Sequence, residues 1–221
     1  MPLPNPQMRE ASIVVTGSFN PAIFHPSWFV RMGIVGANDI DEEALEFVHK
    51  ELSKFPLFNG GMLEVTTDRL QVSTRDIPSF EAVRDLAISI FTHLGHTPVT
   101  NVGINSKIEY QLENEDSWHK VGDTLAPKQI WEKSMPMPVR MLGLFVRSDV
   151  RRDNLPGYLL VRVTGTRPYG VQFDINNHLE LGDGGTDLLR QLIVDHWERL
   201  QAEAVSTAET TLEGCLHEHR R

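Results

Sequence analysis

The chain has one cysteine, Cys215, among 221 residues, and it has no long hydrophobic run. A single cysteine cannot form an internal disulfide, which excludes the small secreted folds that disulfides hold together and favours a reducing compartment. No apolar stretch approaches the roughly 20 residues that a membrane-spanning helix needs. The first residues lack the basic and apolar blocks of a secretory signal peptide. The sequence therefore predicts a cytoplasmic protein that does not engage a membrane.

Positive charge is also scarce, since 21 Lys and Arg residues stand against 30 Asp and Glu residues and the net charge is −9. Nucleic-acid binding depends on clustered cations that neutralise phosphates, so this balance argues against a nucleic-acid partner. The densest basic group is Arg147, Arg151 and Arg152, but Asp149 and Asp153 alternate with it. A solvated turn explains this group better, and nucleic-acid recognition through the turn stays an alternative.

The sequence contains no complete catalytic, cofactor or metal-binding motif, and we predict no cofactor. His93 and His96 lie three residues apart near the predicted end of a helix, where two histidines can share a metal ion. Gly95 is expected to end that helix, and no third ligand lies nearby in the sequence. A histidine near the last carbonyl groups of a helix is favourable without a metal. The pattern therefore argues against a metal site.

Three residues are the leading candidates for acid–base chemistry if the protein is an enzyme. Asp174 and His178 belong to a polar cluster on or after a predicted strand, and a general base needs a hydrogen-bonding partner of this kind. His119 is the third candidate and comes from a distant part of the chain. Convergence of the three side chains in one cleft would support a site assembled from distant residues. Without a motif, the sequence favours a non-enzymatic role.

The spacing of apolar residues predicts an α+β fold. The expected strands fall in antiparallel groups, which indicates one antiparallel sheet of about six to seven strands with helices packed on one face. Leu45, Val48, Leu52 and Phe55 follow one another at intervals of three and four residues, which predicts a helix over Asp41–Phe55. The other expected helices and strands are residues 79–94, 116–125 and 186–205 for helices, and 12–17, 62–74 (a hairpin), 102–112, 139–146, 158–166 and 169–181 for strands.

We expect a single domain over residues 12–205. Prolines near the start predict a flexible N-terminal tail at residues 1–11, and the polar composition of the chain end predicts a polar C-terminal tail at 206–221. The proline-rich segment 127–138 is a possible boundary between two subdomains. No internal repeat stands out in the sequence.

Trp28 and Trp131 are the main candidates for an interaction surface, because they lie in irregular segments flanked by prolines. Phe29 and Ile130 stand beside them, and exposed aromatic residues dominate the binding energy of protein interfaces. Core packing is the alternative for the same residues, since large aromatic side chains are usually mostly buried. The interface hypothesis expects that alanine at Trp28 or Trp131 weakens assembly and leaves the fold intact.

Four segments carry a resemblance to a known group of proteins: Asp68–Thr74 (DRLQVST), His96–Asn105 (HTPVTNVGIN), Trp118–Lys128 (WHKVGDTLAPK) and Asn176–Leu181 (NNHLEL). With them, most of the chain between positions 12 and about 204 resembles a sporadically distributed, uncharacterised bacterial protein family with no assigned activity. The resemblance implies no catalytic residue and no cofactor. Patchy distribution is typical of mobile accessory systems such as phage defence or toxin–antitoxin modules, so the resemblance favours that setting by association.

These observations predict a non-enzymatic protein-interaction component of a bacterial accessory system, acting with a protein partner or as a homo-oligomer. The first alternative is an enzyme or toxin component whose site comes from distant residues. The second is a nucleic-acid-binding protein.

Overall fold

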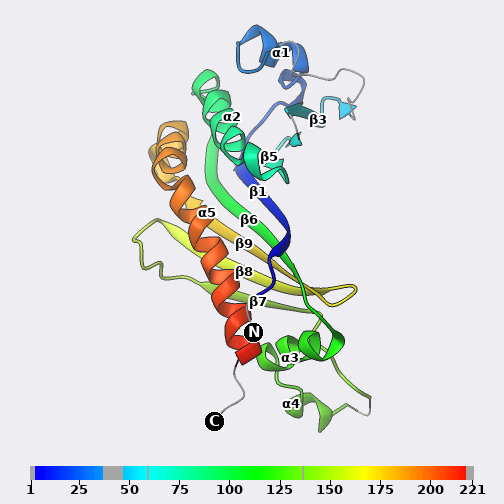
Figure 1. The fold of residues 1–221 in the computed structure, drawn as a ribbon. Helices are drawn as coiled ribbons and strands as arrows, with labels where there is room; N and C mark the ends of the chain where they lie inside the picture. The colour runs from blue at the N-terminus through cyan, green and yellow to red at the C-terminus, as the bar shows by residue number, and fades with distance from the viewer. Residues whose placement is uncertain (1–2, 37–46, 59, 136, 218–221) are drawn as a thin grey trace.

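Helices and strands contribute similar numbers of residues to the computed structural model, which describes residues 3–36, 47–58, 60–135 and 137–217 (Figure 1). The helices are α1 (Pro26–Arg31), α2 (Phe80–His93), α3 (Glu115–Leu125), α4 (Gln129–Glu132) and α5 (Gly185–His217). The strands are β1 (Pro6–Gly17), β2 (Phe47–Val48), β3 (Leu52–Phe58), β4 (Gly61–Thr66), β5 (Arg69–Thr74), β6 (Val99–Gln111), β7 (Gly143–Ser148), β8 (Gly157–Thr166) and β9 (Gly170–Glu180).

These strands form one antiparallel sheet in the order β2-β3-β4-β5-β1-β6-β9-β8-β7. The helices α2 and α5 contact each other and pack on one face of the sheet (Figure 1). The predicted α+β class with an antiparallel sheet is confirmed. The sheet has more strands than the six to seven expected, and the additional ones are β2 and β3.

The topology of the first half of the sheet repeats in the second half, although the sequence shows no internal repeat. In each half a central strand is followed by a three-stranded meander that returns to it, and then by a long helix. The first half consists of β1, β3–β5 and α2, and the second consists of β6, β7–β9 and α5. Because β1 and β6 pair at the centre, β3 and β7 occupy equivalent outer positions.

The core lies between the helices and the face of the sheet that they cover. Ala11, Ile13 and Val15 alternate along β1 and are completely buried on this face. A buried polar contact also joins the two layers, because Ser106 on β6 donates a hydrogen bond to the side-chain oxygen of Gln201 on α5, at 2.7 Å. Burying both polar groups costs little because each has a partner.

The helix predicted over Asp41–Phe55 is wrong where the structure describes it, and residues 41–46 lie outside the described part. Residues 47–48 and 52–58 are strands. Ser53, Phe55 and Leu57 are completely buried, which is the two-residue alternation of a strand. The spacing of Val48, Leu52 and Phe55 fits a helical period as well, and pairing with β4 decides for the strand.

The structure also differs from the tails expected at 1–11 and 206–221. β1 begins at Pro6, and residues 8–11 already pair with β6. The helix α5 continues to His217, because buried residues at 208, 212 and 215 extend its apolar side. The sheet contains strands from both sides of segment 127–138, so it runs across the possible subdomain boundary.

Within the described residues, none of the helices is both long and apolar enough to cross a membrane.

The last turns of α5 should contribute to stability as a packed part of the core. Leu212 is completely buried in a cluster with Val121 and Phe173, so Leu212→Ala should lower the free energy of unfolding by about 2–5 kcal/mol. Glu213→Ala, on the exposed side of the same turn, is the matched control and should change it by less than about 0.5 kcal/mol. Urea denaturation measures both. Equal, small effects would show that this end of α5 does not support the fold.

Candidate interaction surface

The structure separates the four residues that the sequence proposed for an interaction surface. Trp28 and Phe29 lie on α1 within the core, with exposed fractions of 7% and 0%, and their ring centroids are 4.8 Å apart in an edge-on arrangement. Ile130 and Trp131 lie on α4 and are 71% and 51% exposed. Buried side chains cannot contact a partner while the fold is intact, so the interface hypothesis now depends on Ile130 and Trp131.

Exposed apolar side chains are concentrated around these two residues. Of the twelve large apolar side chains that are exposed in the described part of the chain, eight lie between positions 130 and 150. Large exposed apolar patches on soluble proteins commonly mark interaction sites, whereas scattered single residues do not. The eight are Ile130, Trp131, Met135, Met137, Leu142, Phe145, Val146 and Val150.

The first five of these residues form what we call the α4 surface: Ile130, Trp131, Met135, Met137 and Leu142. Trp131, Met135 and Leu142 line a common hollow between α4 and the start of β7. Methionine and tryptophan are enriched in protein interfaces, because one side chain adapts its shape and the other supplies a large rigid contact.

Two basic residues, Lys128 and Arg140, line the hollow of the α4 surface. Segment 128–152 contains six basic and two acidic residues, which gives it a net charge of +4 in a chain of −9. Arg140 lines the same hollow, and no ion pair of the described residues involves Arg140, Lys133 or Arg152. Arg140 and Lys133, beside exposed apolar residues, are complementary to a partner that presents acidic side chains.

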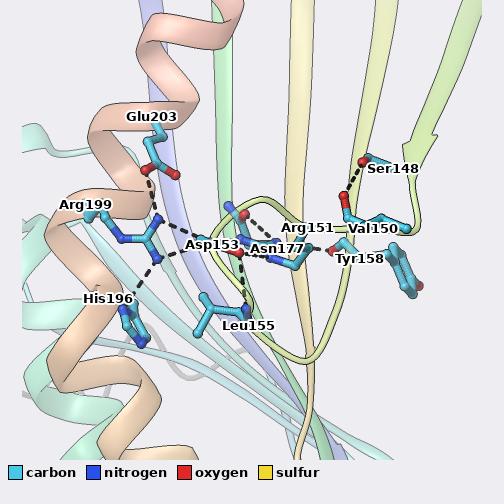
Figure 2. A network of polar contacts seen from close by, with 10 residues as sticks. All are labelled: Ser148, Val150, Arg151, Asp153, Leu155, Tyr158, Asn177, His196, Arg199 and Glu203. Atoms are coloured by element: carbon cyan, nitrogen blue, oxygen red, sulfur yellow. Dashed lines mark hydrogen bonds and ion pairs between the residues drawn. The ribbon is translucent and has the colours of Figure 1, made fainter.

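The loop that follows β7 is tied to α5 and β9 by a polar network, which Figure 2 shows. Arg151 donates two hydrogen bonds to Asp153, at 2.9 and 2.7 Å, and a third to the side-chain oxygen of Asn177 at 3.0 Å. Arg199 on α5 donates to Asp153 at 3.1 Å and to Glu203 at 2.8 Å. Bidentate pairs of this kind constrain geometry, so the network holds the loop against the helix.

The environment of Asp153 stabilises the ionised form of its carboxyl group. The hydrogen bonds from Arg151 hold the pKa of Asp153 well below its usual range, against the opposite effect of partial burial. The backbone N–H of Leu155 and the guanidinium of Arg199 act in the same direction as Arg151. Asp153 is therefore ionised at neutral pH and serves as the centre of the network.

The basic turn that was the nucleic-acid alternative is partly occupied by internal contacts. The side chain of Arg151 is only 6% exposed because it belongs to the network. The guanidinium of Arg147 lies 3.9 Å from the ring centroid of Tyr158 and pairs with Asp149 at 2.5 Å. Of the three arginines, Arg152 alone has no carboxylate within ion-pair distance among the described residues.

The structure does not join the three candidates for catalysis. Asp174 and His178 lie on the helix-free face of β9, four residues and therefore about 13 Å apart. The imidazole of His178 stacks on Tyr158 with a centroid distance of 4.4 Å, and burial lowers its pKa. Asp174 lies 4.0 Å from the ammonium group of Lys107. His119 is on α3, and no hydrogen bond or ion pair of the described residues links it to either candidate.

His93 is the last residue of α2 and His96 lies three residues beyond it, and both side chains are exposed. The His93 ring is 6.5 Å from Trp28, edge to face. Within residues 3–36, 47–58, 60–135 and 137–217, no three His, Cys, Asp or Glu side chains are grouped so that they could hold a metal ion.

Neither a protein-family model nor a curated protein matches the chain.

The sequence does not indicate that the apolar residues of β7 are exposed. The run Leu144-Phe145-Val146 is typical of a strand, and the sequence predicted one there. Exposure of Phe145 and Val146 follows from the position of β7 at the edge of the sheet, beyond the cover of the helices. No local signal in the sequence reports that position.

Alanine substitution of Trp28 and of Trp131 should change the free energy of unfolding by very different amounts. Trp28→Ala should lower the free energy of unfolding by about 3–5 kcal/mol, because it removes an aromatic side chain from the core. Trp131→Ala should change it by less than about 1 kcal/mol, since half of the side chain is already in solvent. Thermal and urea denaturation compare the two. Strong destabilisation by Trp131→Ala would mean that α4 packs as core and presents no docking surface.

Asp153→Asn should lower the free energy of unfolding at neutral pH by about 2 kcal/mol, since it replaces charge-assisted hydrogen bonds by weaker ones. The folded-state pKa lies below the unfolded value, so this contribution is present at neutral pH and is lost as the pH falls below about 4. The variant should therefore show a smaller loss of stability on acidification.

Asp149→Asn is the matched control for Asp153→Asn, because it removes an exposed ion pair from the same loop. Its effect should lie within about 1 kcal/mol. Denaturant titrations at a series of pH values measure both variants. Equal effects of the two substitutions would contradict a structural role for the network.

Proposed function

We propose that the protein is a non-enzymatic protein-interaction component that binds a partner protein through the α4 surface. The observation that carries the proposal is the concentration of exposed apolar side chains at positions 130–142. Five of the twelve exposed large apolar side chains of the described residues fall within this short segment. Leaving such side chains in water is unfavourable, and a partner that covers them gains the corresponding free energy.

Trp131 is the expected anchor of the contact. Its indole ring lines the hollow next to Met135 and Leu142, and it is half exposed, so a partner side chain that enters the hollow would bury the rest of it. Residues at the centre of an interface that become fully buried contribute most of the binding energy. Ile130 and Met137 would form the surrounding contacts.

The charge around the α4 surface indicates the chemistry of the partner. Arg140 and Lys133 have no acidic partner among the described residues, and both flank the exposed apolar side chains. A segment that combines apolar and acidic side chains would satisfy both features. The net charge of −9 for the whole chain makes this basic segment a local attraction for such a partner.

The alternatives have less support. No hydrogen bond or ion pair of the described residues joins Asp174, His178 and His119, as an assembled catalytic site would require. Two arginines of the basic turn already have carboxylate partners. The resemblance to a sporadically distributed bacterial family makes an accessory system, such as phage defence or a toxin–antitoxin module, the setting that we propose.

Affinity purification of the full chain from its native host, followed by reconstitution with the purified partner, tests the proposal. Trp131→Ala should weaken the reconstituted complex by about 30-fold or more, because loss of an interface anchor costs at least about 2 kcal/mol. Arg140→Ser should weaken it less, and the effect of salt on the affinity should be smaller in that variant.

Ile77→Ser is the matched control, since Ile77 is 51% exposed but lies far along the chain, before α2. It should leave the affinity unchanged. Equal binding by the wild type and Trp131→Ala would overturn the proposal, as would binding of the wild type to lipid vesicles in place of a protein.

A further inference from the structure

The two outer edges of the sheet differ, although the repeated topology makes β3 and β7 equivalent. β3 is covered by β2, which pairs with it antiparallel through Phe47 and Val48. β3 also carries Lys54 and Pro56, which are typical protections of an edge strand. In the described part of the chain, β7 pairs with β8 alone, and nothing lies on its outer side.

The sequence of β7 offers little protection against pairing with another strand. It contains no proline, no lysine and no bulge, and its pairing with β8 is regular along its length. Apolar side chains are exposed on both of its faces, with Phe145 at 64% and Val146 at 53%. A regular, apolar and uncovered edge of this kind is a template for strand addition.

We propose that β7 pairs antiparallel with β7 of a second copy of this chain, which joins two sheets into one. This inference concerns the edge of β7, which adjoins the α4 surface at Leu142, and it does not depend on the proposed function. In an antiparallel pair, residues directly opposite each other lie on the same face of the sheet. A two-fold axis at Phe145 therefore places Phe145 opposite its own copy.

The segment is self-complementary in this arrangement. Leu144 lies opposite Val146 of the other copy, and the reverse pair repeats the contact, so all three apolar residues meet apolar partners. Arg147 lies opposite Gly143, which has no side chain. The pairing therefore avoids the repulsion that like charges directly opposite each other would cause.

Charged side chains do not oppose the pairing beyond the ends of the strand. Extending the same antiparallel alignment places Ser148 opposite Leu142 and Asp149 opposite Met141 of the other copy, so no two charges of the same sign lie opposite each other. Asp149 pairs with Arg147 of its own chain, and its side chain is 70% exposed. The apolar centre, whose residues match those of their own copy about one axis, selects a second copy as the occupant of the edge.

Light scattering on the full chain after size exclusion, over a wide concentration range, tests the pairing. The wild type should reach twice the 25.0 kDa mass of one chain. Phe145→Lys should remain at 25.0 kDa, because it places two cations opposite each other at the axis. Val194→Lys, at a residue of α5 that is 59% exposed, is the matched control and should still dimerise.

Cysteine cross-linking keeps the test decisive if Phe145→Lys fails to fold. Opposite residues have Cβ atoms about 4.5–5.5 Å apart, which is close to the separation in a disulfide. Phe145→Cys should therefore cross-link to its own copy under mild oxidation. Leu144→Cys alone should not, but it should cross-link with Val146→Cys when the two variants are mixed. Cys215 is buried and should not interfere.

A wild type that stays at 25.0 kDa at every concentration would overturn the inference. So would a dimer that Phe145→Lys leaves intact, or one in which Phe145→Cys does not cross-link. A monomer that still binds its partner through Trp131 would refute this pairing and leave the proposed function standing. A dimer whose affinity for the partner is unchanged by Trp131→Ala would refute the proposed function and leave the β7 pairing standing.

Discussion

The pairing of β1 with β6 is the interaction on which the rest of the structure depends. These two strands run side by side from Pro6 to Gly17 in β1 and from Val99 to Tyr110 in β6. Each then receives a meander on its other side, from β5 or from β9. Because α2 and α5 follow the two meanders, the position of both helices over the sheet also follows from this central contact. Strands that lie further from the β1–β6 pair are nearer to an edge of the sheet.

The same arrangement explains where apolar side chains remain exposed. The helices cover the centre of the sheet, where Ile13 and Ile104 are buried. The region from α4 to β7 lies outside this cover, and Trp131 and Phe145 are exposed there. The network around Asp153 holds the following loop against α5, so β7 is supported from one side, while no strand of the described residues pairs with its outer side. Stability and interaction thus occupy separate parts of one sheet.

Part of the candidate site could be predicted from the sequence. The irregular segment around Ile130 and Trp131 predicts that they are exposed, because irregular segments run over protein surfaces. The same criterion applies to Trp28 and Phe29, which the structure buries in a cluster with Phe24 and Phe55. The two pairs look alike locally, and only contacts with distant residues distinguish them. The sequence does not indicate the contact between Asp153 and Arg199, because 46 residues separate them in the chain.

The sequence by itself determined the α+β class and the antiparallel sheet, and it located α2, α5 and seven of the nine described strands approximately, because the period of apolar residues is a local property of a segment. Only the tertiary structure decided that residues 52–58 form a strand, that α5 extends to His217, and that β7 is an open edge. Each of these three features depends on which distant segment of the chain packs beside it, because burial stabilises both segments together. The spacing of apolar residues within one segment does not indicate which other segment that is.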